Sequence, residues 1–381
     1  MQVAIVTIAL LAAAQLSAAQ PPAQAALMIE WQAERLVVPG AKGFTVAADG
    51  RLLCWATRRE EGRINLRVLE SRDDGRTFTA LPGIVDSDTA GVDLGDASLL
   101  AARDGSLWIS YRHIHGGERP DYAIKVARST DNGRTWTRTM VAESAGIRGK
   151  PSRGLWASCL FQRSDGVVQC YYDDEDIAFR GGKPQHQWIA MKTWDGSAWS
   201  EAVVVSRARD PAKLSRDGMM SVVEVAPMKL LVAFESVSID RPHENVVRSV
   251  TSDDGGATWS WRQREREILY AAPTRPHMAF APWMAALGGE RLICVLVTDE
   301  DRAVADVSGT PPHRMNADVK YVTSADAGRT WSASAPIAID SHRYYLPGVC
   351  VRTIDGKAEV LVTYLDFADG KCRLARGRVA P

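Results

Sequence analysis

The stretch Ser71-Arg72-Asp73-Asp74-Gly75-Arg76-Thr77-Phe78 decides the fold because it recurs along the chain. Three further copies share its order of Ser, Asp, Gly, Thr and a final aromatic residue, and they begin at Ser129, Ser252 and Ser324. The interval from Ser129 to Ser252 is about twice that from Ser71 to Ser129. A degenerate copy of the octet over residues 193–199 lies near the midpoint of the longer interval. Such internal periodicity indicates a repeat architecture.

The chemistry of this octet is that of a hairpin turn. The Gly accepts a positive φ, the Asp and Ser or Thr side chains bond the amides of the turn itself, and the terminal aromatic ring fills the space between strands. We therefore assign the octet a structural role and no catalytic role.

Each octet is preceded by two short apolar runs joined by a polar turn, such as Asp49-Gly50, Asp104-Gly105 and Asp165-Gly166. These runs have the residues and spacing of β-hairpins, and no segment has a helical period. Six such units predict an all-β fold, a six-bladed β-propeller with Asp-box hairpin turns. The predicted blades cover residues 41–84, 96–145, 156–206, 217–268, 277–337 and 346–381, and residues 28–38 supply the missing outer strand of the last blade.

The N-terminal segment differs from the rest of the chain. Residues 1–19 form an apolar run that ends in Ser17-Ala18-Ala19, which is typical of a cleaved signal peptide. We predict a signal peptide over 1–19, a linker over 20–27 and a single propeller domain over 28–381. The mature protein is expected to be secreted or periplasmic, without a membrane association after cleavage, and a monomer.

Charge and cysteine content exclude several classes. The 46 basic residues balance the 46 acidic ones, whereas nucleic-acid binders usually show a basic excess. The 6 Cys show no CxxC spacing, and no HExxH or phosphate loop is present. We expect neither a cofactor nor a metal site; the thiols are expected to be buried and free, although a disulfide between neighbouring strands stays open.

One face of the ring is predicted to carry the chemistry. In each unit the start of the first strand and the end of the second strand lie on the same face, while the Asp-Gly turns lie on the other. The positions on the first face gather acids, arginines, histidines and aromatic residues, among them Lys42, Asp93, Asp96, Arg112, His113 and Asp173. This asymmetry favours a pocket at the axis.

Two carboxyl groups are needed for glycoside hydrolysis. Glu235 follows the apolar run Leu230–Phe234, so that partial desolvation would raise its pKa toward acid/base use. Asp174 and Glu175 hold the equivalent place in the preceding unit and are the candidate partners. The four consecutive acids over residues 173–176 could instead bind a cation or be solvated.

The octets resemble the Asp boxes of the sialidase superfamily, which implies a propeller fold for nearly the whole mature chain. Within it, Gly154-Leu155-Trp156, Tyr171-Tyr172-Asp173-Asp174-Glu175, Arg216-Asp217-Gly218-Met219 and Phe234-Glu235 resemble the third and fourth blades of exo-α-1,5-L-arabinanases. That family uses two glutamates in a retaining mechanism, and the aromatic-Glu position corresponds to Glu235. Where the family has Glu after Gly-Leu-Trp, this chain has Ala157-Ser158. If that Glu is the family's nucleophile, the departure implies that Asp174 or Glu175 takes its role, that another substrate is cleaved, or that the protein is inactive.

These observations predict a secreted, exo-acting glycoside hydrolase that removes terminal sugars from a glycan. The catalytic candidates are Glu235, Glu175 and Asp174, and the candidate substrate-binding residues are Arg153, Trp156, Tyr172, Arg216, Asp217, Arg275, His277, Arg343, Tyr345 and His113. A sialidase would hold an acidic sugar through Arg216, Arg275 and Arg343, although the Arg-Ile-Pro that opens the first sialidase blade is missing. A carbohydrate-binding propeller without catalysis would also fit these residues, as would a polysaccharide lyase with a His or Tyr base.

Overall fold

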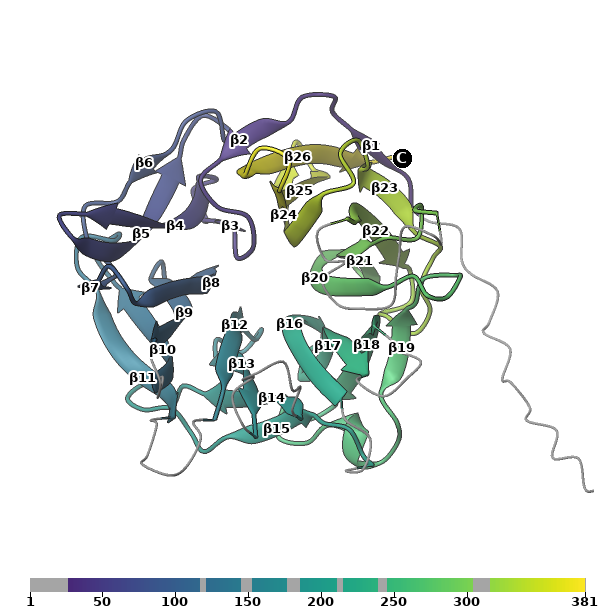
Figure 1. Ribbon diagram of the computed structural model, residues 1–381, viewed down its shortest axis with the longest axis horizontal. Coiled ribbons are helices and arrows are strands. Elements are labelled where there is room, and N and C mark those ends of the chain that lie inside the picture. The colour runs from purple at the N-terminus through teal and green to yellow at the C-terminus, as the bar shows by residue number, and fades with distance from the viewer. Residues whose placement is uncertain are drawn as a thin grey trace, which may run out of the picture.

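The computed structural model describes residues 27–116, 121–144, 153–176, 186–210, 215–238, 245–303 and 316–380 (Figure 1). Within these ranges the chain is almost entirely β-strand, and the one helical element is a 3-10 turn at Ser260–Arg262. The predicted signal peptide lies outside the described residues, as does the predicted linker except for Leu27. None of the described helical segments has the length and apolarity that a membrane span requires.

The described strands form five hydrogen-bonded sheets. The first sheet contains β3 (Thr45–Val46), β4 (Leu52–Glu60), β5 (Arg63–Ser71), β6 (Thr79–Ala80) and β7 (Asp86–Thr89). The second contains β8 (Asp93–Ala101), β9 (Leu107–His115), β10 (Asp121–Ser129) and β11 (Thr137–Ser144). The third contains β12 (Leu155–Gln162), β13 (Val168–Glu175), β14 (Gln187–Thr193), β15 (Val203–Ser206), β16 (Ser215–Ala226), β17 (Lys229–Ser238), β18 (Asn245–Ser252) and β19 (Glu267–Tyr270). The fourth contains β20 (Ala279–Gly288), β21 (Arg291–Thr298), β22 (Asp318–Ser324) and β23 (Ala335–Ala338). The fifth contains β24 (Tyr344–Ile354), β25 (Lys357–Asp366) and β26 (Lys371–Val379), together with β1 (Ile29–Trp31) and β2 (Leu36–Val38).

The sheets are antiparallel meanders arranged in a ring, with β8, β12, β16, β20 and β24 nearest the axis (Figure 1). The third sheet has 8 strands because β14 and β16 join two meanders through one parallel pair, Gln187 with Arg216. The prediction of an all-β propeller is confirmed. The number of blades stays a prediction, since hydrogen bonding alone gives five sheets.

The N-terminal segment completes the last sheet, as predicted. Ile29 pairs with Val379 and Leu36 pairs with Leu374, so that β1 and β2 both add to the outer edge of β26. The backbone N–H of Ala380 also donates to the Met28 carbonyl at 2.9 Å. First and last segments of the described chain therefore share one sheet.

The octets form the turns that the sequence predicted. In the second copy, Asp131 accepts hydrogen bonds from Ser129 Oγ at 2.8 Å, Thr135 N at 2.9 Å and Thr135 Oγ1 at 2.6 Å. Gly133 adopts a φ of 77° and donates its N–H to Ser129 Oγ at 2.8 Å. The copies that begin at Ser71, Ser252 and Ser324 repeat these bonds.

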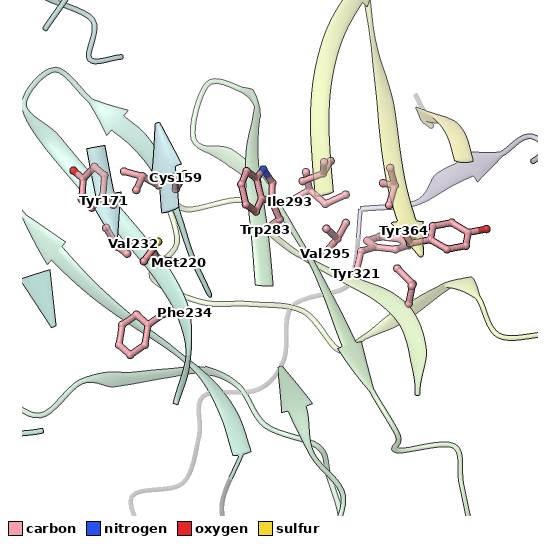
Figure 2. Close-up of a cluster of buried hydrophobic side chains, with 14 of the residues drawn as sticks. Cys159, Tyr171, Met220, Val232, Phe234, Trp283, Ile293, Val295, Tyr321 and Tyr364 are labelled. Carbon is pink, nitrogen blue, oxygen red and sulfur yellow. The ribbon is translucent and has the colours of Figure 1, made fainter. Parts of the chain in front are cut away.

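Apolar side chains fill the space between successive sheets. The largest cluster runs from Tyr171 and Met220 through Phe234 and Trp283 to Tyr364, and Figure 2 shows these side chains between strands of neighbouring sheets. The six cysteines are free thiols, four of them buried. Burial raises the pKa of the Cys159 thiol to about 11, so these groups behave as small apolar core residues.

Candidate active site

A β-bulge recurs at the same place in the strand nearest the axis of successive meanders. The pairing register shifts between Gly95 and Ser98 in β8, and again at the same place in β12, β16, β20 and β24. Four of these bulges contain a non-glycine residue with positive φ, namely Asp96 (49°), Met219 (51°), Ala281 (51°) and Leu346 (51°). The amides of three of these bulges, at Ala157, Met219 and Ala281, donate to carboxyl groups instead of to a neighbouring strand.

Asp173 on β13 is the carboxyl group near these bulges whose pKa is raised most. Its side chain is buried, and Oδ2 accepts hydrogen bonds from the bulge amides of Ala157 at 3.3 Å and Met219 at 3.2 Å. Oδ1 has no hydrogen-bond partner among the described residues. Burial raises the pKa of Asp173 to about 8, and the nearby Asp96 and Glu235 carboxylates act in the same direction, against Lys42 and the Met219 amide. A carboxyl of this kind holds its proton at neutral pH.

Gly218 makes room for Asp173. A Cβ on Gly218 would lie 2.9 Å from Asp173 Oδ2 and 2.2 Å from Gln187 Nε2. Gly218 is also the residue paired with Glu235 across β16 and β17. The glycine of the Arg-Asp-Gly-Met sequence therefore lets the Asp173 carboxyl approach β16.

Glu235 on β17 is buried, and its Oε2 accepts a hydrogen bond from the bulge amide of Ala281 at 3.1 Å. This arrangement repeats that of Asp173, which bonds the bulge amide of Met219 in the next meander along the chain. Two carboxyls from consecutive meanders are thus held in the same way by backbone N–H groups of the following bulges.

Two cations, Lys42 and Arg112, complete a cluster with Asp173, Glu235 and Asp96, which we call the Asp173 cluster. Lys42 is 3% exposed; its Nζ lies 2.7 Å from Asp96 Oδ1 and 5.7 Å from the centre of the Trp283 ring. Arg112 reaches Asp93 at 2.9 Å and Asp96 at 3.4 Å. Burial alone would raise the pKa of Asp96, but Lys42 and Arg112 outweigh it and lower the pKa. The cluster therefore combines an ionised Asp96 with a protonated Asp173.

Tyr345 links the fifth sheet to the third across this region. Its hydroxyl donates to Met219 Sδ at 3.3 Å, and its ring stacks on Phe367 at 6.2 Å and lies 6.0 Å from Phe280. Among the predicted substrate-binding residues, Tyr345 contacts Met219, whose amide bonds Asp173.

The structure places the two predicted partners of Glu235 outside the Asp173 cluster: Asp174 points to the other side of β13, and Glu175 lies beside the cluster. Asp174 lies in a groove formed with Arg153, Glu143, Lys192 and Tyr172. It forms an ion pair with Arg153 at 2.8 Å, and burial raises its pKa to about 6 although Arg153 opposes this. The groove lies between β11 and the third sheet, so Asp174 points to the opposite side of β13 from Asp173.

Glu175 is fully buried and contacts residues other than those around Asp173. It accepts a hydrogen bond from Trp156 Nε1 at 2.6 Å and forms an ion pair with Arg216, which also contacts Gln187. The ring of Trp156 meets Tyr122 edge to face at 5.2 Å. These contacts give Glu175, Trp156 and Arg216 a positioning role beside the cluster.

The remaining predicted binding residues lie in other surroundings. Asp217 is buried and bonded by Arg266, Ser206 and Ser236. Arg275 and Arg343 are exposed, and both ring nitrogens of His277 face backbone carbonyls. His113 contacts Asp88 of the first sheet at 2.9 Å. Tyr172 is buried in an apolar cluster, which raises its pKa.

No family model matches the sequence, and no curated protein matches it. Solved structures do match. An α-L-arabinanase of Penicillium chrysogenum complexed with arabinobiose is 17% identical over 94% of this chain and 98% of that chain, with a TM-score of 0.63. A sialidase of Trypanosoma rangeli in complex with sialic acid is 14% identical over 94% of this chain and 59% of that chain, with a TM-score of 0.51. The chain has the sialidase-like propeller fold.

An α-L-arabinofuranosidase of Fusarium graminearum with arabinobiose has the same sialidase-like propeller fold, at 17% identity over 91% of this chain and 96% of that chain and a TM-score of 0.59. Identities this low establish the fold and leave the chemistry to the site. In this sialidase-like propeller, Asp173 and Glu235 are two buried carboxyl groups held in the same way by bulge amides.

Proposed function

We propose that the protein is a glycoside hydrolase that cleaves terminal sugars with Asp173 and Glu235 as its two carboxyl groups. The observation that carries the proposal is the raised pKa of Asp173, at about 8, next to a second buried carboxyl from the following meander. Carboxyl groups with a raised pKa that lie next to a second carboxyl group cluster at catalytic sites.

The proposed reaction divides the work between the two groups. Asp173 holds a proton at neutral pH and would donate it to the glycosidic oxygen as the bond to the sugar breaks. Glu235 would stabilise the developing positive charge and attack the anomeric carbon or activate a water molecule. Lys42 and Arg112 keep Asp96 ionised beside them and neutralise its charge, so Glu235 is the group proposed to face the oxocarbenium-like transition state.

Asp173 lies next to Ala157, the position at which the glutamate of the arabinanase family is missing. The resemblance to exo-α-1,5-L-arabinanases implies a glutamate directly after Gly-Leu-Trp, where this chain has Ala157. The Ala157 amide donates to Asp173 Oδ2, so a carboxylate from β13 occupies the neighbourhood of the absent side chain. We infer that Asp173, rather than Asp174 or Glu175, supplies the second carboxyl group beside Glu235.

A neutral sugar is the favoured substrate. The cations nearest the cluster, Lys42 and Arg112, are already paired with Asp93 and Asp96. Arg216, which in a sialidase would hold the carboxylate of an acidic sugar, is paired with Glu175. Two of the similar solved structures are complexes with arabinobiose, which supports an arabinose-containing glycan as the substrate. We further propose an exo-acting, exported enzyme with six blades, counted by treating the 8-stranded sheet as two.

The test is turnover of arabinan, arabino-oligosaccharides and an aryl α-L-arabinofuranoside by the wild type and three variants. Asp173→Asn and Glu235→Gln should each lower kcat/KM at least ~100-fold, with thermal midpoints that show folded protein. The wild-type kcat/KM should fall as the pH rises through about 8, since Asp173 then loses its proton.

Asp174→Asn separates this proposal from an assignment based on sequence alone. A loss confined to Asp174→Asn, with Asp173→Asn within tenfold of the wild type, would overturn the role of Asp173. Release of sialic acid or of an unsaturated uronate instead of arabinose would favour a sialidase or a lyase. Glycan binding without any product would favour the non-catalytic propeller.

A further inference from the structure

A cluster of three metal-ligating side chains lies where the first sheet meets the second, apart from the residues around Asp173. Asp88 is on β7, and His113 and His115 are two residues apart on β9, so both histidines face the same side of their sheet. The ligand atoms of all three side chains lie within 4.8 Å of one another. We propose that these residues form a zinc site that joins the two sheets.

The separations suit a single small ion. Asp88 Oδ2 lies 2.9 Å from His113 Nε2 and 3.3 Å from His115 Nε2. Adjacent ligands in a tetrahedral zinc site, with metal–ligand distances of about 2.0–2.1 Å, are separated by about 3.3 Å. The three atoms can therefore close around an ion with small side-chain movements.

Neighbouring groups hold two of the ligands in place. The Thr89 amide donates to Asp88 Oδ1 at 2.6 Å, which leaves Oδ2 turned toward the imidazoles. Asp86 Oδ2 lies 3.5 Å from His113 Nδ1, the ring nitrogen opposite the proposed ligand atom. A carboxylate at that nitrogen is the usual orienting partner of a zinc-bound histidine.

Lys125 sets a condition for binding. Its Nζ contacts His113 Nδ1 and lies 3.4 Å from Asp86 Oδ2. When Nε2 binds the ion, the proton of the neutral ring resides on Nδ1 and is donated to Asp86, so Lys125 keeps only its contact with Asp86. Removing the ammonium group should therefore strengthen zinc binding.

The ligand set selects the kind of ion. Calcium and magnesium take oxygen ligands, whereas two imidazoles and one carboxylate suit zinc or a similar transition ion. The His113 side chain is 6% exposed, that of Asp88 25% and that of His115 51%. Solvent can therefore reach the site and supply the fourth ligand, and an ion there would hold β7 against β9.

The experiment is calorimetric titration of untagged protein, stripped with chelator, with zinc chloride and in parallel with magnesium chloride. We expect one equivalent of zinc at micromolar affinity, no magnesium binding, and a higher thermal midpoint with zinc. His115→Ala and Asp88→Asn should each weaken zinc binding at least tenfold and abolish the thermal shift, while Lys125→Met should tighten binding. His115 is half exposed, so its variant is expected to fold.

The matched control is His342→Ala, which removes a histidine paired with one carboxylate, Asp318, at 2.7 Å. This variant should bind zinc like the wild type. The proposal is overturned if the wild type binds less than a tenth of an equivalent of zinc, or if His115→Ala and Asp88→Asn both bind zinc with wild-type affinity.

Discussion

At the scale of single residues, the run of four acids over 173–176 shows how neighbours in sequence acquire different roles. Asp173 and Glu175 point to the side of β13 that faces β16, where they meet Met219 and Arg216. Asp174 points to the opposite side and meets Arg153. Strand alternation thus separates a perturbed acid, a groove residue and a buried ion pair.

The pH dependence of stability follows from the burial of Asp173. Its pKa is about 8 in the folded protein against 3.8 ordinarily, so between about pH 4 and pH 8 the unfolded chain binds fewer protons at this group. The free energy of unfolding therefore falls as the pH rises through that window. Asp173→Asn cannot ionise, so its thermal midpoint relative to the wild type should rise from pH 5 to pH 8. A constant difference across that range would contradict the raised pKa.

Glu175 should matter for stability. Removing one partner of its buried ion pair with Arg216 leaves a charge without compensation, and we expect Glu175→Gln to lower the free energy of unfolding by about 3 kcal/mol. The measurement is urea unfolding of Glu175→Gln, Arg216→Met and the double variant. The double variant should lose less than the sum of the single losses, and strict additivity would argue against the pair.

At the scale of elements, the sequence predicts the turns and strands well. Gly, Asp, Ser and Thr at fixed spacing specify the octet turn through local hydrogen bonds, and the Asp-Gly hairpins are equally local. The site is predicted less completely, because the direction of each side chain depends on the bulge between Leu155 and Ser158. Strand alternation places Asp173 and Asp174 on opposite sides of β13, but nothing in the residue order shows which side faces β16.

The octets should contribute measurably to stability. Asp254 accepts bonds from Ser252 Oγ at 2.8 Å, Thr258 N at 2.9 Å and Thr258 Oγ1 at 2.6 Å, all of which Asp254→Ala removes. We expect its thermal midpoint to fall by about 2 °C or more. The adjacent Asp253→Ala is the control, since that side chain is 82% exposed. Equal midpoints for the two variants would remove the structural role of the octet.

At the scale of the whole molecule, the cluster near the axis draws on several sheets. Lys42 precedes β3, Asp96 comes from β8, Asp173 from β13, Glu235 from β17 and Tyr345 from β24. Balanced net charge in the sequence therefore conceals acids and bases gathered in one region. Sequence periodicity could predict the ring, whereas the contacts across it depend on how successive sheets are placed.

Closure of the ring should depend on the N-terminal segment. A chain that begins at residue 39 lacks β1 and β2 and exposes the edge of β26, which we expect to lower the thermal midpoint and promote aggregation. A chain that begins at residue 27 is the control. Thermal unfolding and light scattering compare the two, and equal behaviour would show that β1 and β2 are dispensable.

The pairing of β1 and β2 with β26 also constrains the order of events during synthesis. These two strands leave the ribosome first among the described strands, yet their partner is made last. The central sheets can form from local hairpins while translation continues, but the outer edge of the final sheet must wait for a segment more than 300 residues upstream to return. The ring therefore closes only after β26 has been made, and until then the N-terminal strands have to avoid other sheet edges.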